Sequence, residues 1–340
     1  MFVEIQLFQY HHLLNPRFIG YTLAMKRSKY GKILPKPLKK GDTIGIVAPA
    51  CYFDPKKFQK GVKCLQNLGY TVKYDPNIFK KYWSLAGKDN VRAKQINRMF
   101  ADKEVRAIMC AQAGYGSVRT IPYLERKILA KNPKIFVGYS DITALLSYLA
   151  KTARMVVFHG LVVSSEIHEH MNAETLNSLI RVIAQPKPLG EITNKKMESL
   201  RPGKATGELI GGNLSLIIDT IGTPYDLNTN NKILFIEDAG EELEVIDSCL
   251  MHLKLAGKLK RVKGIIFGRM KDCVNFYGSR YSIKDILNDI LQDVDIPILY
   301  GFPSGHREAG QPDITLPFGI SVTLDANKKK VIFNEAAVRS

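Results

Sequence analysis

"KIFVGYSDITALLSYLA", residues 134–150, passes directly from apolar, strand-forming residues into a helical pattern. The pattern changes at 138–141, so a buried strand is expected to end where a helix begins. This arrangement presents one side chain, Ser140, beyond the end of a sheet. Ser140 is then either a nucleophile on a tight turn or the N-cap of the helix. Only half of the G-x-S-x-G pattern is present, because Ile142 occupies the place of the second glycine.

The alternation of strand and helix extends outward from this stretch. Strands are predicted at 42–50, 70–76 and 105–111, with helical patterns between them at 54–69 and 90–102. Strands separated by helices of this length are typical of parallel βαβ units. The sequence therefore predicts an α/β fold whose N-terminal part is a doubly wound parallel sheet.

Three turns are expected at one edge of that sheet, namely 48–50, 114–116 and 138–140. Ligands of doubly wound sheets bind beyond the carboxyl ends of the strands, so a site is predicted there. The Gly-Tyr-Gly turn at 114–116 opens a helix, and its backbone amides can bind an anion. It is not a dinucleotide fingerprint, because Arg119 stands where the third glycine is needed. A nicotinamide cofactor is therefore not expected.

A second unit follows a polar stretch with three prolines, which predicts a linker. Beyond it we expect a strand at 231–240, an amphipathic helix at 241–259 and a strand at 263–270. The glycine pair in "GELIGGNL", residues 207–214, is either a turn required for packing or a wall of the site. The predicted division is a basic, poorly structured leader (1–36), an α/β nucleophile domain (37–183), a linker (184–206) and a smaller mixed α/β C-terminal domain (207–337).

The charge distribution argues against a specific nucleic-acid partner. The net charge is +17, and residues 1–40 carry eight Lys and Arg against one acid, or +7. No nucleic-acid motif and no basic stripe with interleaved aromatics is found, so a solvated basic surface is expected. Residues 1–24 are interpreted as a leader ahead of a working start at Met25, with a secretory signal as the alternative.

The cysteines and the hydropathy pattern indicate the cellular compartment in which the protein is expected. The five cysteines are scattered, odd in number and never arranged as Cys-x-x-Cys. This pattern favours a reducing, cytoplasmic location over a disulfide framework or a thiolate zinc site. No apolar run reaches the roughly 18 to 20 residues that span a membrane.

A nucleophilic serine needs a base, normally histidine. Of the seven histidines, His306 lies in the Gly/Pro loop "GFPSGHREAG", where nothing structural requires an imidazole. His159 ends a predicted strand and could also reach the site. His168 and His170 are expected on a solvent-facing polar helix, with a metal pair as the lesser alternative.

The serine's base needs an acid that orients it. Glu237 and Asp238 end the apolar run "KILFIED", where a predicted strand leaves the core. Either carboxylate could orient a histidine, and either could be a helix-start anion or a surface ion pair. The choice between them remains open on these residues alone.

Seven blocks in order resemble the LD-carboxypeptidase family of serine peptidases, which includes muropeptide LD-carboxypeptidases and microcin-immunity peptidases. They are "GDTIGIVAPA", "AGYGSVR", "VGYSDITALL", "FHG", "GELIGGNLSLI", "ILFIEDAGEE" and "GFPSGH". The resemblance runs from about residue 40 to residue 335. It implies an α/β N-terminal domain, a smaller C-terminal domain, a site between them and a homodimer. One departure is Gln112-Ala113, where the family usually has Arg-Gly.

The resemblance also implies roles. Ser140 is the expected nucleophile, His306 the general base and Glu237 the orienting acid, with the amides of Asp141 and Gly114 as the oxyanion hole. The expected reaction splits the bond between the L-centre of diaminopimelate, or L-Lys, and terminal D-Ala of murein tetrapeptides, in peptidoglycan recycling. The alternative is hydrolysis of peptidyl- or aminoacyl-nucleotide conjugates. No metal or cofactor is expected.

Overall fold

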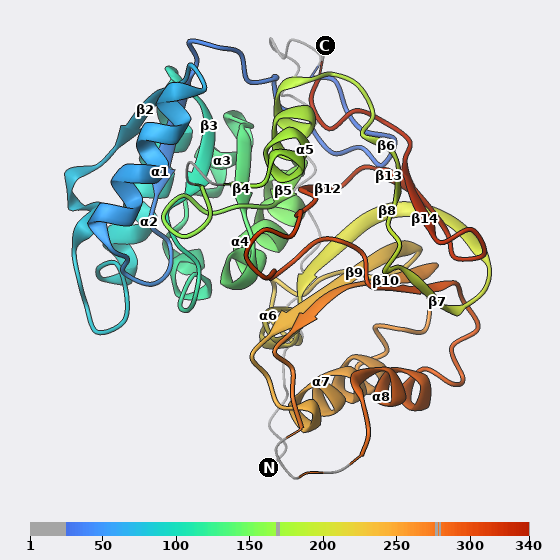
Figure 1. The fold of residues 1–340 in the computed structure, drawn as a ribbon. Coiled ribbons are helices and arrows are strands. Elements are labelled where there is room, and N and C mark those ends of the chain that lie inside the picture. Colours follow the sequence, from blue (N-terminus) through green and yellow to red (C-terminus); the bar gives the residue numbers. More distant parts are fainter. Residues whose placement is uncertain (1–24, 168–170, 276–277, 279, 340) are drawn as a thin grey trace, which may run out of the picture.

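The structure is a computed structural model that describes residues 25–167, 171–275, 278 and 280–339. It contains two β-sheets, one in each half of the molecule (Figure 1). The N-terminal half is built around a mostly parallel sheet with helices, and the C-terminal half around a second, mixed sheet. The predicted α/β fold class is confirmed. No helix among these residues is long and apolar enough to cross a membrane.

The first sheet has six strands in the order β12-β5-β4-β3-β1-β2. Its strands are β1 (Thr43–Val47), β2 (Thr71–Tyr74), β3 (Val105–Cys110), β4 (Ile135–Gly138), β5 (Val157–His159) and β12 (Leu316–Phe318). All neighbours pair in parallel except β12, which is antiparallel to β5. Strand β4 is buried along its whole length, as expected of a parallel strand covered on both faces.

The connections of this sheet carry its helices. The α-helices are α1 (Pro55–Asn67), α2 (Asp89–Ala101), α3 (Arg126–Lys131), α4 (Thr143–Tyr148) and α5 (Ala173–Ala184). Shorter helical turns are η1 (Pro76–Phe79), η2 (Val118–Tyr123), η3 (Ser140–Ile142) and η4 (Leu149–Ala153). The turn η3 and helix α4 follow β4 directly, so the strand-to-helix transition predicted at 138–141 is confirmed.

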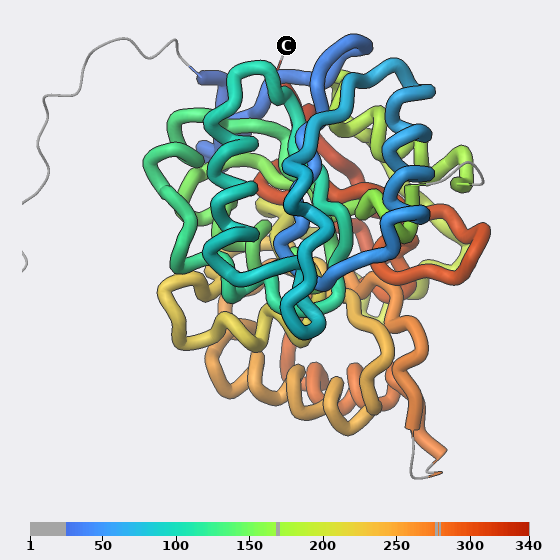
Figure 2. Tube along the Cα trace, turned by 90° about the vertical axis from the view of Figure 1, so that its left-hand side faces the viewer, coloured from blue at the N-terminus to red at the C-terminus, as the bar shows by residue number. Residues whose placement is uncertain are grey.

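The second sheet has eight strands in the order β6-β14-β13-β8-β9-β10-β11-β7. Its strands are β6 (Gly190–Thr193), β7 (Glu198–Arg201), β8 (Lys204–Asn213), β9 (Lys232–Ala239), β10 (Gly264–Lys271), β11 (Ile298–Tyr300), β13 (Ser321–Asp325) and β14 (Lys330–Phe333). Its helices are α6 (Leu214–Asp219), α7 (Leu243–Leu255) and α8 (Ile283–Ile290). Helices α7 and α8 lie at the end of the molecule farthest from the first sheet (Figure 2).

The segment 184–206, predicted as a linker, is not one. It contains β6 and β7, which form the two edges of the second sheet. Both strands are short, polar and only half-buried, because an edge strand packs on one face. The three prolines lie outside the strand residues, at positions 186, 188 and 202. These prolines correctly indicated turns. The two strands were missed because a polar strand of four residues shows almost no alternation of apolar and polar residues.

The predicted boundaries differ from the structure at two further places. Strand β12 comes from the segment predicted as the C-terminal domain, yet it pairs with β5 of the first sheet. In the predicted leader, Ile33 forms a bridge to Met155, and Leu34 is buried. Residues 25–36 are therefore packed, because their few apolar side chains cover the core beside the first sheet. The remainder of the leader, 1–24, lies outside the described residues.

The two halves meet closely at Gly212, the last glycine of β8. Gly212 has φ +140, and a Cβ there would lie 2.5 Å from the side chain of Thr143 at the start of α4. The backbone amide of Asn213 also donates to Thr143 Oγ1 at 3.0 Å. Of the two interpretations of "GELIGGNL", packing is therefore correct, and the packing places β8 against the helix that follows Ser140.

Replacing Gly212 by alanine tests this contact. We expect Gly212→Ala to lower the free energy of unfolding by about 2 to 4 kcal/mol, combining backbone strain with overpacking against Thr143. Chemical denaturation measures the change. Gly222→Ala is the control, because Gly222 has φ +80 and a Cβ there would have nothing within 4 Å. It should lose only about 1 kcal/mol from strain, and equal losses for both variants would contradict the interpretation.

Candidate active site

Ser140 lies in the turn that joins β4 to α4. Its φ is +58, a left-handed conformation that is uncommon outside glycine. Gly138 allows the turn, since a Cβ there would lie 2.7 Å from Ile142 Cγ2. Neither η3 nor α4 has a side-chain cap hydrogen bond. The helix-capping interpretation of Ser140 is therefore wrong, and the strained turn is of the kind that displays a functional side chain.

Glu237 and His306 form a hydrogen-bonded pair in the second half of the chain. Glu237, on β9, is fully buried, and its Oε2 lies 2.7 Å from His306 Nδ1. The same oxygen accepts the backbone N–H of His306 at 3.2 Å. A carboxylate only accepts hydrogen bonds, so Nδ1 carries the proton and Nε2 is left as the basic nitrogen.

The pair shifts the pKa of both members. Burial alone would raise the pKa of Glu237, but the hydrogen bonds and charge of His306 outweigh burial and lower it. Burial alone would lower the pKa of His306, but the hydrogen bond and charge of Glu237 outweigh burial and raise it above its ordinary value of 6.5. A carboxylate that holds an imidazole in one tautomer and stabilises its protonated form suits a general base.

The loop that carries His306 is fixed from both sides. Gly305 has φ +101, and a Cβ there would lie 2.7 Å from Glu237 Oε2, so only glycine allows this approach. Arg269 of β10 holds the loop by hydrogen bonds to the carbonyls of Gly305 and Pro312 and by an ion pair with Asp313. The imidazole is thus positioned by backbone constraints as well as by its acid.

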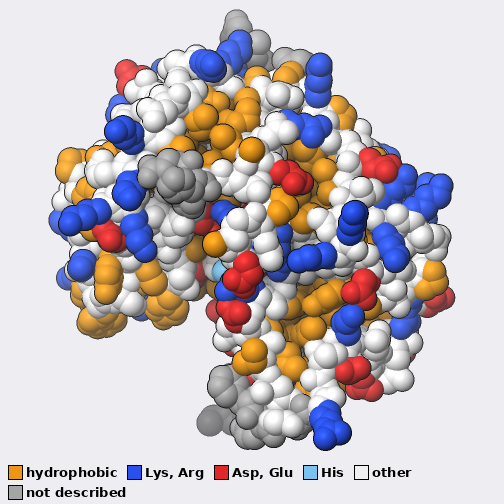
Figure 3. Space-filling view, in the orientation of Figure 1, with side chains coloured by type: hydrophobic (Ala, Val, Ile, Leu, Met, Phe, Trp, Pro, Cys, Tyr) orange, Lys and Arg blue, Asp and Glu red, His pale blue; other side chains and the backbone are white. Residues whose placement is uncertain are grey.

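Tyr139 brings this pair next to the serine turn. Its ring centroid lies 4.9 Å from that of His306, and its hydroxyl donates to Glu166 Oε1 at 2.5 Å. Tyr139 directly precedes Ser140, so the turn that carries Ser140 and the Glu237–His306 pair lie on neighbouring segments where the two halves meet. The space-filling view shows a hollow between the halves on this face (Figure 3).

The glycine turn is tied to the residue after the serine. The Asp141 carboxylate accepts the amides of Gly116 at 3.0 Å and Ser117 at 2.8 Å, and the Ser117 hydroxyl donates to the Asp141 carbonyl at 2.6 Å. By contrast, the amides of Asp141 and Gly114 donate to no group among the described residues. The family resemblance implies these two amides as the oxyanion hole, and both are available as donors; Gly114 has φ +110.

The structure resolves two alternatives left open by the sequence. Asp238 faces away from His306, because successive strand residues point to opposite faces. Its carboxylate accepts from the Asn213 side chain at 2.8 Å and from Ser215 at 2.8 to 3.0 Å. His159 pairs with Gly138 at the end of β4, but it is 1 % exposed and enclosed by aromatic rings, so its imidazole is not accessible to a substrate.

The structure leaves one predicted site untested and gives Gln112 a hydrogen-bond partner. His168 and His170 lie outside the described residues, so the metal pair stays a prediction. Gln112, at the departure from the family turn, accepts a hydrogen bond from the Ser164 hydroxyl at 2.5 Å.

Sequence reasoning missed two contacts beside the serine. They are the hydrogen bonds of the Asp141 carboxylate to the glycine turn and the hydrogen bond between Tyr139 and Glu166. Tyr139 and Asp141 flank the serine, which was a signal that their side chains could be structural. Nothing in the sequence placed Glu166 beside them.

Both halves of the chain match one family. Residues 44–160 match the family described as LD-carboxypeptidase N-terminal domain, and residues 206–324 match LD-carboxypeptidase C-terminal domain. A protein named probable murein peptide carboxypeptidase, from Bacillus subtilis strain 168, is 37% identical over 306 residues. The alignment covers 89% of this chain and 95% of that protein.

Solved structures agree with this match. The muramoyltetrapeptide carboxypeptidase from Oxalobacter formigenes has a TM-score of 0.77 and 27% identity, and the match covers 86% of this chain and 99% of that one. The microcin C7 self-immunity protein MccF, in complex with aspartyl sulfamoyl adenosine, has a TM-score of 0.82 and 26% identity. That match covers 90% of this chain and 99% of the other.

The coupling between Glu237 and His306 can be measured without a substrate. We expect the His306 imidazole to titrate above 6.5 in the wild type, and below 6.5 in Glu237→Gln, because burial then acts without the opposing charge. NMR titration of the ring resonances measures both values, with His306→Gln used for assignment. Glu308→Gln, a charge change on the same loop, should leave the titration unchanged. An unshifted pKa in Glu237→Gln would contradict the pairing.

Proposed function

The chain belongs to the LD-carboxypeptidase family, and on this premise we propose that it is a serine carboxypeptidase acting on murein tetrapeptides. The observation that carries the proposal is the buried Glu237–His306 pair beside a serine held at φ +58. The bond cleaved joins the L-centre of diaminopimelate, or L-Lys, to terminal D-alanine. The products are the tripeptide and free D-alanine, as in peptidoglycan recycling in the cytoplasm.

Acylation begins when His306 Nε2 takes the proton of the Ser140 hydroxyl. The Ser140 oxygen attacks the scissile carbonyl carbon and forms a tetrahedral oxyanion. The amides of Asp141 and Gly114 stabilise this oxyanion, at about 3 kcal/mol for each donor. His306, whose protonated ring is stabilised by Glu237, then donates the proton to the departing nitrogen, and D-alanine leaves.

Deacylation repeats the same steps with water. His306 takes a proton from the water, whose oxygen attacks the acyl carbonyl and forms a second oxyanion. Collapse of this intermediate breaks the bond to Ser140, and His306 returns the proton to the serine oxygen. No step requires a group beyond the chain's own residues and water. The homodimer implied by the family resemblance is part of the proposal, and sedimentation equilibrium would report it.

Release of D-alanine tests the reaction and the nucleophile together. Wild-type protein should release D-alanine from L-Ala-γ-D-Glu-meso-diaminopimelate-D-Ala, and Ser140→Ala should reduce kcat by about 10⁶-fold, to background. A coupled D-amino-acid oxidase assay follows the product. Ser248→Ala, at an exposed serine on α7 away from the site, is the matched control. Full activity in Ser140→Ala would contradict the mechanism, and an inactive but folded wild type would contradict the substrate.

One observation favours the second candidate, hydrolysis of aminoacyl-nucleotide conjugates. Trp83, the single tryptophan of the chain, is 73 % exposed and stacks on Tyr82 with ring centroids 4.5 Å apart. The loop that carries it touches the glycine turn, since a Cβ on Gly116 would lie 2.4 Å from Leu85. An exposed tryptophan backed by a half-buried tyrosine close to the site is suited to stacking on a nucleobase.

The fluorescence of Trp83 separates the two candidates. Because the chain has one tryptophan, quenching reports on this loop alone. If the carboxypeptidase proposal is correct, millimolar adenosine monophosphate should leave the emission unchanged, as should ribose 5-phosphate. Saturable quenching by the adenine nucleotide only, combined with absent D-alanine release, would favour the second candidate.

A further inference from the structure

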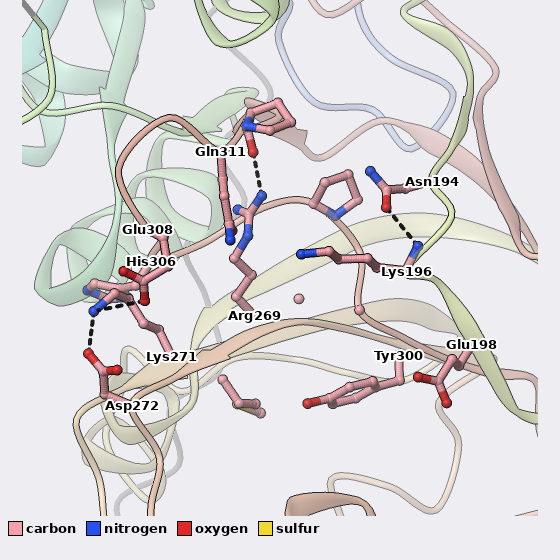
Figure 4. Close-up of a pocket in the computed structure, with 15 residues that line it drawn as sticks. Asn194, Lys196, Glu198, Arg269, Lys271, Asp272, Tyr300, His306, Glu308 and Gln311 are labelled. Atoms are coloured by element: carbon pink, nitrogen blue, oxygen red, sulfur yellow. Dashed lines mark hydrogen bonds and ion pairs between the residues drawn. The ribbon is translucent and has the colours of Figure 1, made fainter. Parts of the chain in front are cut away.

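A groove of about 510 Å³ extends from His306 across the second sheet (Figure 4). Its walls come from three separate segments, namely the turn between β6 and β7, the end of β10, and the chain from β11 through the His306 loop. The volume is in the range of pockets that hold drug-sized ligands. One alanine would leave most of it unfilled, so the groove fits a longer portion of a substrate.

Among the described residues, three lysine or arginine side chains line the groove, and two of them are already paired. Arg269 holds Asp313 and the carbonyls of the His306 loop. Lys271 pairs with Asp272 and Glu308. Both of these charges are therefore committed to holding the walls of the groove in place.

Lys196, the third cation, is free. It has no side-chain hydrogen bond or ion pair among the described residues, and its side chain points across the groove toward Arg269 (Figure 4). Its backbone is fixed, because the Lys196 amide donates to Asn194 Oδ1 at 2.9 Å and a Cβ on Gly301 would lie 2.5 Å from the Lys196 carbonyl. An unpaired ammonium on a rigid turn, over a pocket that ends at the catalytic base, is available for an anion of the ligand.

The rest of the lining suits a peptide. Tyr300, Met270, Pro303 and Pro312 supply apolar surface. Gly268 and Gly301 let the walls pack closely, since a Cβ there would lie 2.6 Å from the Ser304 carbonyl and 2.5 Å from the Lys196 carbonyl, respectively. The neighbouring acid Glu198 pairs with Lys284 and so does not neutralise Lys196. The pocket thus combines an apolar floor with one ammonium group, that of Lys196, that has no partner among the described residues.

We infer that this groove binds the peptide stem on the acyl side of the scissile bond, and that Lys196 pairs with a carboxylate of that stem. The inference rests on the proposed function, since it supplies the substrate. A tetrapeptide stem carries two candidate carboxylates ahead of the scissile bond, the α-carboxylate of γ-linked D-glutamate and the carboxylate at the D-centre of diaminopimelate. Both present the same chemistry to an ammonium group.

Kinetics of Lys196 variants provide the first test. Lys196→Met should raise KM for the tetrapeptide by about 10- to 100-fold, the usual range for one charge-assisted hydrogen bond, and leave kcat within about twofold. Lys196→Arg should retain most of the affinity. Lys195→Met, an exposed neighbour outside the groove, is the matched control. An unchanged KM in Lys196→Met would overturn the inference.

Amidated substrates identify the carboxylate. Two further tetrapeptides carry an amide at the D-glutamate α-carboxylate or at the D-centre of diaminopimelate. Lys196→Met should lose no additional affinity for the peptide that lacks the true partner, as a double-mutant cycle requires for a direct contact. Equal KM losses on all three peptides would overturn the inference, because Lys196 would then not recognise a carboxylate.

Binding separates this inference from the proposed reaction. Calorimetry with Ser140→Ala protein measures tetrapeptide affinity without turnover, and Ser140→Ala/Lys196→Met should bind about 10- to 100-fold more weakly. Lys196-dependent binding with no D-alanine release from wild-type protein would refute the reaction and keep the groove assignment. Binding that does not depend on Lys196, or no binding at all, would overturn the groove assignment whatever the wild-type activity.

Discussion

Burial of the Glu237 carboxylate is the constraint on which the site depends. Its side chain is 0 % exposed, and a buried charge without a partner is strongly destabilising. His306 supplies that partner twice, through its ring and through its backbone amide. The His306 loop must therefore pass within hydrogen-bond distance of β9, which explains the glycine at position 305. The requirement that stabilises the fold here is the same one that selects the imidazole tautomer.

A second buried pair secures the loop at its other end. Burial raises the pKa of Asp313 to about 7, although the charge of Arg269 opposes this. The amide of Asp313 donates to Thr175 Oγ1 at 2.8 Å, and the amide of Thr315 donates to Ser178 Oγ at 2.9 Å. Both hydroxyls belong to α5, one of the helices that connect the first sheet. The chain that leaves His306 is therefore bonded to the half that carries Ser140, and it continues there as β12. Ser140 follows a strand of the first sheet, whereas Glu237 lies on the second. Hydrogen bonds that cross between the two halves are needed to fix the position of one half relative to the other.

The features that sequence could predict are those with a local signal. Strands and helices of the first sheet follow from their alternation, and the turn at Ser140 follows from the change of period. The roles of Glu237 and His306 came from family resemblance, since no spacing links residues so distant in the chain. The resemblance also favoured Glu237 over Asp238, and the structure gives the physical reason, since Glu237 bonds to His306 while Asp238 bonds to Asn213. Strands β6 and β7 escaped prediction because their neighbours across the sheet, rather than their own residues, define them.

The missed strands bear directly on substrate choice. Lys196 lies in the turn between β6 and β7, within the segment that resembled a linker. That turn contributes to the groove but forms no hydrogen bond or ion pair with Glu237 among the described residues. Surface turns tolerate sequence change better than the strands that they join. In the mechanism and groove proposed above, catalysis depends on buried pairs that cannot vary independently, whereas recognition of the peptide stem depends on an edge turn that can. A family with one catalytic pair and different substrates is the expected consequence of that separation.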